Sequence, residues 1–399
     1  MGAHELADRQ DIRFLILYAL AWAGGSIAYV PFLTILLPAH VITLAQEDSV
    51  SWLAYIAFAG AISASAGNIG FGWLSDITRN RRGWIAVGLV LSCALLMAAG
   101  PVEHLLPLLG MVVLWQLGLN MMLGPLAAWA GDCVPDHQKG ALGGLLAFAP
   151  AIGALSGALV TIPGLFAVES RLGIVAMLVA ICVLPVLAFG RPRKFPELLQ
   201  VTELQTGSNP DLPKLHNDVV RMWFARLLVQ ITEAALFAYL LLWFRSIAPS
   251  FSDNDTARIF SFVLMAAVPL AMIAGRWTDL RNRPILPLSV CAAIAAFGLA
   301  IMAWVTDIRA AIFGYAIFGI AAGIFLSLHS AQTLRILPRP ERRGRDLGVF
   351  NLTNTVPSLI MPWLALALVP VFGFSGLFML LALLAAIASL LLLSLALRK

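Results

Sequence analysis

Long apolar stretches separated by short polar or charged segments run through the whole chain. A helix needs about 20 apolar residues to cross the ~30 Å hydrocarbon core of a membrane. Twelve stretches approach or exceed that length, at residues 13–38, 51–74, 84–102, 105–130, 141–166, 173–190, 219–246, 257–277, 285–305, 310–334, 347–370 and 374–397. The pattern therefore predicts an all-α polytopic membrane protein with twelve transmembrane helices.

One long hydrophilic segment, at residues 191–218, separates the first six stretches from the last six. We therefore expect an N-terminal six-helix half at 1–190, a cytoplasmic linker at 191–218 and a C-terminal six-helix half at 219–399. Prolines within the apolar stretches are expected to bend or break spans one, five and eleven, because proline lacks the N–H of a helical hydrogen bond. They are Pro31, Pro38, Pro150 and Pro357.

The composition agrees with a membrane location. Of the 399 residues, 60% are hydrophobic and 12% are charged, and the mean hydropathy is +0.90. A soluble domain is about a quarter charged, so the composition excludes a soluble enzyme, a disordered chain and a secreted disulfide scaffold.

The four cysteines are far apart and form no CxxC pair, and we expect structural thiols and no metal site. No phosphate-cradling loop or nucleophile–base set is evident, which argues against an enzyme, a cofactor or ATP-driven transport.

The basic residues are sorted by side of the membrane. Of the 26 Lys and Arg residues, 20 lie at the termini and in the alternate loops that share their side, and four lie in the opposite loops. The positive-inside rule then places both termini in the cytoplasm. The expected location of the protein is the plasma membrane, which is the inner membrane in a Gram-negative bacterium. The net charge of +5 thus reflects topology, and no nucleic-acid partner is expected. The expected partners are the lipid bilayer and small molecules, and we expect a monomer.

Two loops repeat along the chain. Residues 72–85 read GWLSDITRNRRGWI and residues 275–286 read GRWTDLRNRPIL. Equivalent residues lie 203 positions apart: Gly72 and Gly275, Asp76 and Asp279, and, in a second motif pair, Pro135 and Pro338. Transporters are often built from internal repeats, and this one indicates two pseudo-symmetric halves in parallel orientation.

With these loops, the chain resembles the major facilitator superfamily over essentially its whole length. Residues 72–82 resemble the signature loop between helices two and three of that superfamily, and residues 275–283 resemble its weaker copy. The chain departs from the signature at Ile77, where a basic residue is usual, and at Arg79, where a glycine is usual. SDITRNRR, the region from Asn120 to Gly140 and residues 342–362 are closest to the glycoside–pentoside–hexuronide and sucrose-type symporters.

Acids within these basic loops point to gating. Asp76 and Asp279 add negative charge to these loops, which does not help to anchor a loop at the cytoplasmic membrane surface. Such a carboxylate can pair with an arginine or with a helix N-terminus. The resemblance implies a latch that closes the cytoplasmic side and breaks during alternating access. The expected gating residues are Asp76, Arg81, Arg82, Asp132, Asp279 and Arg283. The alternative is that the arginines only anchor the loops at the cytoplasmic surface.

Ionisable residues within the apolar spans are the sharpest functional pointers, because each is costly there. Glu233 lies near the middle of span seven, and Arg226, Gln230 and Phe237 share its helical face. We hypothesise that Glu233 takes up and releases a proton, with Arg226 and His329 as further proton-coupling residues. The alternatives are a structural Glu233 hydrogen-bonded to a neighbouring helix, and a His329 that only bonds within the bundle.

Uncharged polar and aromatic residues at membrane depth are the candidates for the substrate cavity. Amides offer donors and acceptors, and aromatic faces stack on sugar rings. The candidate substrate-binding residues are Tyr18, Trp22, Tyr29, Gln116, Asn120, Gln230, Tyr239, Asn351 and Asn354. Ordinary helix packing is the alternative for the aromatic residues.

These features together predict a secondary active transporter of a small organic solute that works by alternating access. Proton-coupled symport of a sugar, glycoside or similar metabolite is the specific expectation, and it follows mainly from the resemblance. Two alternatives stay open: efflux of lipophilic compounds by proton antiport, and a non-transporting assembly factor or sensor on the same fold.

Overall fold

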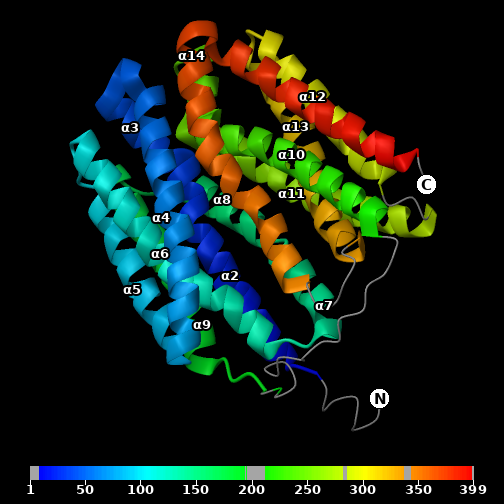
Figure 1. The fold of residues 1–399 in the computed structure, drawn as a ribbon. Coiled ribbons are helices and arrows are strands. Elements are labelled where there is room, and N and C mark those ends of the chain that lie inside the picture. Colours follow the sequence, from blue (N-terminus) through cyan, green and yellow to red (C-terminus); the bar gives the residue numbers. More distant parts are fainter. Residues whose placement is uncertain (1–8, 194, 196–211, 282–284, 337–342, 398–399) are drawn as a thin grey trace. The chain divides into compact units, whose positions relative to one another are not determined.

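The computed structural model describes residues 9–193, 195, 212–281, 285–336 and 343–397 (Figure 1). All regular structure in these residues is helical. The elements are α2 (Ile12–Pro31), η1 (Phe32–Leu36), α3 (Leu37–Ala45), η2 (Gln46–Asp48), α4 (Ser49–Thr78), α5 (Arg81–Ala99), α6 (Leu105–Cys133), α7 (Asp136–Leu146), α8 (Ala149–Val160), η3 (Val168–Ser170), α9 (Arg171–Phe189), α10 (Leu212–Ile247), α11 (Asp253–Arg281), α12 (Leu286–Trp304), α13 (Ile308–Ile336) and α14 (Arg343–Ala396).

The described residues contain ten helical segments that are long and apolar enough to cross a membrane. Two of them, Ile12–Thr78 with 67 residues and Thr353–Ala396 with 44, are long enough for two crossings each. Each contains a residue with positive φ that turns the chain, Gln46 at 48° and Gly373 at 64°. With these two segments counted twice, the fold agrees with the expected twelve-helix membrane protein.

Two of the four prolines coincide with interruptions of the helices. α2 ends at Pro31 and continues as the π-helical turn η1, and α7 and α8 are separated by Ala147 and Phe148, just before Pro150. A proline removes one helical hydrogen bond and its ring crowds the preceding turn, so the backbone changes course there. Pro38 lies in the first turn of α3, directly after η1, whereas Pro357 lies within α14.

The chain divides into two compact units. The first comprises Met1–Gln46, Phe58–Glu203 and Asp253–Ser261, and the second comprises Glu47–Ala57, Leu204–Ser252 and Phe262–Lys399. Most of the first unit comes from the first half of the sequence and most of the second unit from the second half, and the domain boundaries at 190 and 219 stay a prediction. The beginnings of α4 and α11, however, cluster with the unit formed mainly by the other half of the sequence.

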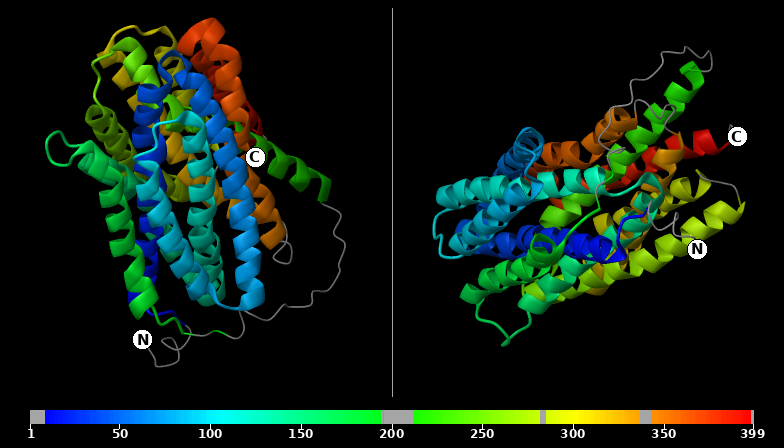
Figure 2. Two further views of the ribbon diagram at one scale, coloured as in Figure 1. Left: turned by 90° about the vertical axis from the view of Figure 1, so that its left-hand side faces the viewer. Right: turned by 90° about the horizontal axis from the view of Figure 1, so that it is seen from below.

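Within each unit, the third and fourth membrane crossings pack closely through a glycine. In the first unit, α2 lies against α8 and α9, and α5 lies against α6 and α9 (Figures 1 and 2). A side chain at Gly88 of α5 would collide with the backbone of Met122 in α6. In the second unit, α12 packs on α13 and α14, and a side chain at Gly298 would collide with the backbone of Phe318. Small residues let helix backbones approach closely in membranes, and both units use them at the same helix pair.

Candidate functional site

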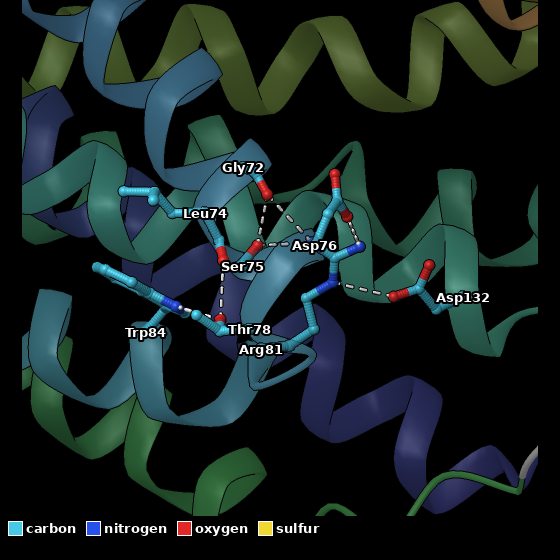
Figure 3. A network of polar contacts seen from close by, with 8 residues as sticks. All are labelled: Gly72, Leu74, Ser75, Asp76, Thr78, Arg81, Trp84 and Asp132. Carbon is cyan, nitrogen blue, oxygen red and sulfur yellow. Dashed lines mark hydrogen bonds and ion pairs between the residues drawn. The ribbon is translucent and has the colours of Figure 1, made fainter.

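An ion cluster joins the ends of α4, α5 and α6 in the first unit (Figure 3). Arg81 lies at its centre. Its Nε donates to Asp132 Oδ2 at 3.0 Å, and its Nη2 pairs with Asp76 Oδ1. Its Nη1 donates to Ser75 Oγ at 2.5 Å and to the Gly72 carbonyl at 3.3 Å. The structure thus shares one basic residue between the two acids, in the first of the two signature-like loops.

The turn between α4 and α5 directs Arg81 into this cluster. α4 ends at Thr78, Arg79 adopts a left-handed conformation with φ of 51°, and α5 begins at Arg81. Asn80 caps α5, since its Oδ1 accepts from the Gly83 N–H at 2.9 Å. Side chains in the first turn of a helix point back toward its N-terminus, so the Arg81 side chain reaches the end of α4.

Exposure sets the strength of the two ion pairs. The Arg81 side chain is 14% exposed, while Asp132 is 34% and Asp76 is 59% exposed. Water screens an exposed pair to about 0–1 kcal/mol, so the Asp132 pair contributes more to holding the three helix ends together than the Asp76 pair. The gating role of these residues stays a prediction.

We expect the Arg79→Gly substitution to stabilise the protein by up to about 1 kcal/mol. A left-handed conformation costs a non-glycine residue about 1–2 kcal/mol, and the greater freedom of glycine in the unfolded chain offsets about half of that gain. Thermal unfolding of the purified protein checks this. Arg79→Ala is the matched control, because it removes the same charge and keeps the strained conformation. Equal midpoints for the two variants would contradict the prediction.

The other expected gating residues are only partly described. The Arg82 guanidinium lies over the ring of Trp129, 5.3 Å from its centre, which ties the start of α5 to the end of α6. Asp279 lies in α11, but its side chain lies outside the described residues, and so does the whole of Arg283. The structure therefore describes the first of the two repeated loops and not the contacts of the second.

A second polar site lies on α10 in the second unit. Arg226, Gln230, Glu233 and Phe237 are all partly exposed and recur at one helical face. Many residues around the rest of the helix are buried, among them Leu227, Val229, Ile231, Thr232, Ala235 and Leu236. The face that the sequence analysis selected is therefore a partly exposed side of α10.

Side chains from α10, α13 and α14 meet at the end of this face that holds Arg226 and Gln230. Asn354 of α14 is exposed, and its Oδ1 accepts from Gln230 Nε2 at 2.7 Å and from Arg226 Nη2 at 3.3 Å. His329 of α13 is fully buried, with Nδ1 3.4 Å from Arg226 Nη1 and Nε2 2.9 Å from the Met222 carbonyl. We call Arg226, Gln230, His329 and Asn354 the α10 polar cluster.

These contacts define the tautomer of His329. The Met222 carbonyl can only accept, so Nε2 carries the hydrogen and donates. The lone pair of Nδ1 then faces the Arg226 guanidinium, which can only donate. In this arrangement the imidazole is neutral, and both of its nitrogens serve to position α10 and Arg226.

Glu233 lies about 10 Å along the helix axis from Arg226, at 1.5 Å per residue. Within the described residues it forms no hydrogen bond, but it interacts electrostatically with Arg226 and with the buried Tyr315 of α13. The described residues therefore do not show the bond to a neighbouring helix that a purely structural acid would make.

A third polar site, made of amide side chains, lies in the first unit. Asn120 Nδ2 donates to the Gln116 carbonyl at 2.9 Å, and Asn68 Nδ2 donates to Asn120 Oδ1 at 3.2 Å. Gln116 and Asn120 are buried, whereas Asn68 is exposed. These amides of α4 and α6 form a chain in which Asn68, which the sequence analysis did not select, is the member nearest the surface.

The aromatic candidates are placed differently from one another. Tyr18 is buried, its hydroxyl donates to the Leu126 carbonyl at 2.9 Å, and its ring stacks on Trp22, which is partly exposed. Tyr29 is also partly exposed. Tyr239 is buried, and its hydroxyl finds no partner among the described residues. The side chain of Asn351 lies outside the described residues.

Sequence reasoning missed a contact set at the start of α11. Arg171 Nη1 lies 3.7 Å from Asp253 Oδ2, and Asn254 Nδ2 donates to the Ala158 carbonyl at 2.9 Å and to Thr161 Oγ1 at 3.2 Å. These bonds hold Asp253–Ser261 in the first unit while the rest of α11 belongs to the second. Adjacent Asp and Asn residues at a helix start are an ordinary capping pattern, so the sequence carried no signal for this role.

It also missed a buried glutamine that links three distant segments of the first unit. Gln10 is 3% exposed, and its Nε2 donates to the Cys133 carbonyl at 2.7 Å. Its Oε1 accepts from the Arg193 N–H at 2.9 Å, and its own N–H donates to Gln138 Oε1 at 2.6 Å. Gln10 thereby ties the chain before α2 to the turn between α6 and α7 and to the segment that follows α9.

Comparison with known proteins gives one family and one fold. The profile described as Major Facilitator Superfamily matches residues 14–304 and 222–399. No curated protein matches the sequence. A bacterial homologue of the human lysosomal transporter Spinster, in an inward-facing and unoccupied conformation, has a similar structure, with a TM-score of 0.67 and 13% identity over 96% of this chain and 95% of its own. A mutant of the nucleoside transporter NupG has a TM-score of 0.71 and 13% identity over 96% of this chain and 99% of its own. At this identity the likeness concerns the fold.

Proposed function

This chain belongs to the Major Facilitator Superfamily, and from that premise we propose that it is a proton-coupled symporter of a sugar, glycoside or similar polar metabolite. The family and the fold support a secondary transporter rather than an enzyme. Solute and proton would cross together as the two units alternate in access. The proposed location is the plasma membrane, with both termini in the cytoplasm, in line with the distribution of basic residues.

One observation carries the proposal: the partly exposed face of α10 holds a carboxylate at membrane depth. Ionisable residues within membrane helices are expensive and mark transport pathways or proton relays. Glu233 lies on the same face as Arg226, so its protonation changes the charge along that face. The described residues provide no hydrogen bond that would hold Glu233 in a purely structural role.

Uncharged polar groups support a polar solute. Gln230 and Asn354 lie in the α10 polar cluster, and Asn68, Asn120 and Gln116 form the amide chain of the first unit. Carboxamides donate and accept hydrogen bonds, which suits hydroxyl-rich solutes. The resemblance of the loop and of residues 342–362 to sugar and glycoside symporters supports the same class.

Proton flux in proteoliposomes tests this function. The purified full chain is reconstituted with a pH-sensitive dye inside the vesicles and with the membrane potential clamped by potassium and valinomycin. A panel of monosaccharides, glycosides and hydroxylated organic acids is then added outside. We expect at least one solute to acidify the lumen as it enters, because a symporter carries the proton inward with it.

Protein-free vesicles are the control for passive leakage of solute and proton. Alkalinisation of the lumen on solute entry would indicate antiport and would contradict the proposal. Solute entry with no proton movement at all would also contradict it, because transport would then be uncoupled from the proton.

A further inference from the structure

The carboxamide of Gln10 caps the end of α6 from a segment 123 positions away in the sequence. α6 ends at Cys133, and the last carbonyls of a helix have no partner within the helix. Gln10 Nε2 donates to the Cys133 carbonyl at 2.7 Å and so supplies that partner from the segment before α2. The Gln10 side chain is 3% exposed, so this bond is protected from exchange with water.

The other hydrogen bonds of this carboxamide fix its orientation. Nε2 also donates to the Arg193 carbonyl at 3.2 Å, and Oε1 accepts from the N–H groups of Arg193 at 2.9 Å and Asp11 at 3.0 Å. An amide nitrogen offers two hydrogens and an amide oxygen offers two lone pairs. All four are used, and they require the nitrogen of Gln10 to face the Cys133 carbonyl.

Gln10 also continues a row of contacts between α2 and α6. Residues spaced by four lie on one face of a helix, and Gln10, Phe14 and Tyr18 have this spacing along the start of the chain. The Phe14 ring packs edge-on against Trp129, with 5.4 Å between ring centres, and the Tyr18 hydroxyl donates to the Leu126 carbonyl at 2.9 Å. The row therefore fixes where the end of α6 lies along α2.

The same end of α6 carries Asp132, the less exposed of the two acids that pair with Arg81. We call the ion pairs of Arg81 with Asp76 and Asp132 the latch. The partial negative charge at a helix C-terminus disfavours a carboxylate there, so Asp132 depends on donors from outside α6. Arg81 of α5 supplies one to Asp132 itself, and Gln10 supplies one to the carbonyl of the next residue.

We infer that Gln10 is a positioning residue of the latch, which holds the end of α6 where Asp132 meets Arg81. The inference rests on the proposed function, because a latch has a role only in a protein that alternates in access. It gives the segment before α2 a part in gating, although Gln10 bonds to neither Asp132 nor Arg81 among the contacts described above.

The test places a reporter on α5, which lies on the other side of the latch from Gln10. Ile85 is fully buried, four residues after Arg81. In a background with all four cysteines replaced by serine, the Ile85→Cys thiol is labelled with a membrane-impermeant maleimide in inside-out vesicles. Gln10→Met keeps the length of the side chain and removes its donors, and we expect it to raise the labelling rate about fivefold.

The decisive measurement repeats this substitution in the Arg81→Gln background. If Gln10 acts through Asp132 and Arg81, Gln10→Met is expected to change the labelling rate less than about twofold once Arg81 is absent, because coupled residues are not additive. The same factor in both backgrounds would show that Gln10 only ties the chain together, and it overturns the inference. No change in either background overturns it as well.

A second variant isolates the donor. Gln10→Glu keeps the shape and the acceptor oxygen of the side chain but turns a carboxylate oxygen toward the Cys133 and Arg193 carbonyls. We expect it to raise labelling at least as much as Gln10→Met, and labelling at the unmodified rate overturns the inference.

Ser63→Ala is the matched control for the loss of one bond to α6. Ser63 Oγ donates to the Val113 carbonyl in an earlier part of that helix at 2.7 Å, and its loss is expected to leave the labelling of Ile85→Cys unchanged. Equal increases in Ser63→Ala and Gln10→Met would overturn a specific role of Gln10.

Gln138→Ala keeps the inference testable if the Gln10 variants do not fold. Gln138 holds the backbone of Gln10, accepting from its N–H at 2.6 Å and donating to its carbonyl at 3.2 Å. Its removal is expected to raise labelling about twofold, and an unchanged rate overturns the inference. Coupling between Gln10 and Arg81 without proton flux for any solute supports the positioning role and defeats only the proposed proton coupling.

Discussion

Replacing Glu233 with glutamine is expected to abolish proton-driven accumulation of solute while leaving solute exchange across the membrane. Glutamine imitates the protonated acid in shape and polarity but cannot release a proton. With a pH difference of two units, one-proton symport sustains a gradient of about 100-fold, since each unit corresponds to 1.36 kcal/mol. The variant is expected to reach a gradient of about one. The measurement is accumulation of labelled solute in proteoliposomes, beside counterflow with solute on both sides.

The exposed acid Glu169 supplies the matched control for this experiment. Glu169→Gln makes the same chemical change outside the α10 face and is expected to accumulate solute as the unmodified protein does. Retained accumulation in Glu233→Gln would contradict a proton-carrying role. Equal loss of accumulation and counterflow, together with a lower unfolding temperature, would indicate that Glu233 is structural.

Replacing Arg81 with glutamine is expected to slow transport about tenfold and to shift the resting protein toward cytoplasmic access. The substitution leaves Asp76 and Asp132 close together without the cation that they share. A part-buried charged hydrogen bond contributes about 1.5–3 kcal/mol, and exposure of the acids reduces that value. A remaining change of about 1.4 kcal/mol alters an equilibrium tenfold, which is enough to change the population of a gate.

The same logic ranks the two acids. Asp132→Asn is expected to have the larger effect and Asp76→Asn the smaller, because Asp132 is the less exposed of the two. Arg79→Gln is the matched control, since it removes an exposed charge from the same loop. Access is measured by thiol labelling of single cysteines placed at the two ends of the spans. An Arg81→Gln protein with unchanged rate and unchanged access would contradict the latch.

Much of the fold follows from properties of single residues. Hydropathy alone placed the apolar spans, because a segment of about 20 apolar residues gains free energy in lipid whatever its neighbours are. The break at Pro150 and the bend at Pro31 followed from the missing N–H. The backbone has a positive φ at Arg79. This conformation explains why a glycine is usual at that position of the signature.

The sites could be predicted only in part. Periodicity placed Arg226, Gln230 and Glu233 on one face, because helical spacing is a property of one segment. It could not show that Asn354 and His329 meet Arg226 from α14 and α13, nor that Tyr18 gives its hydroxyl to the Leu126 carbonyl. Gln10 carried no signal at all, although two distant segments of the first unit, the α6–α7 junction and the segment after α9, bond to it.

The sequence by itself thus determined the membrane location, the repeated loops and the few charges that the hydrocarbon tolerates, since these depend on composition and on spacing along one helix. Only the tertiary structure decided which polar groups share a partner: Arg81 with Asp76 and Asp132, and Arg226 with His329 and Asn354. The physical reason is that a hydrogen bond or ion pair depends on how each helix is rotated and how closely it packs. Rotation and distance arise from contacts between residues far apart in the sequence, 51 positions for Arg81 and Asp132 and more than 100 for Arg226 and its partners, and no local pattern contains them.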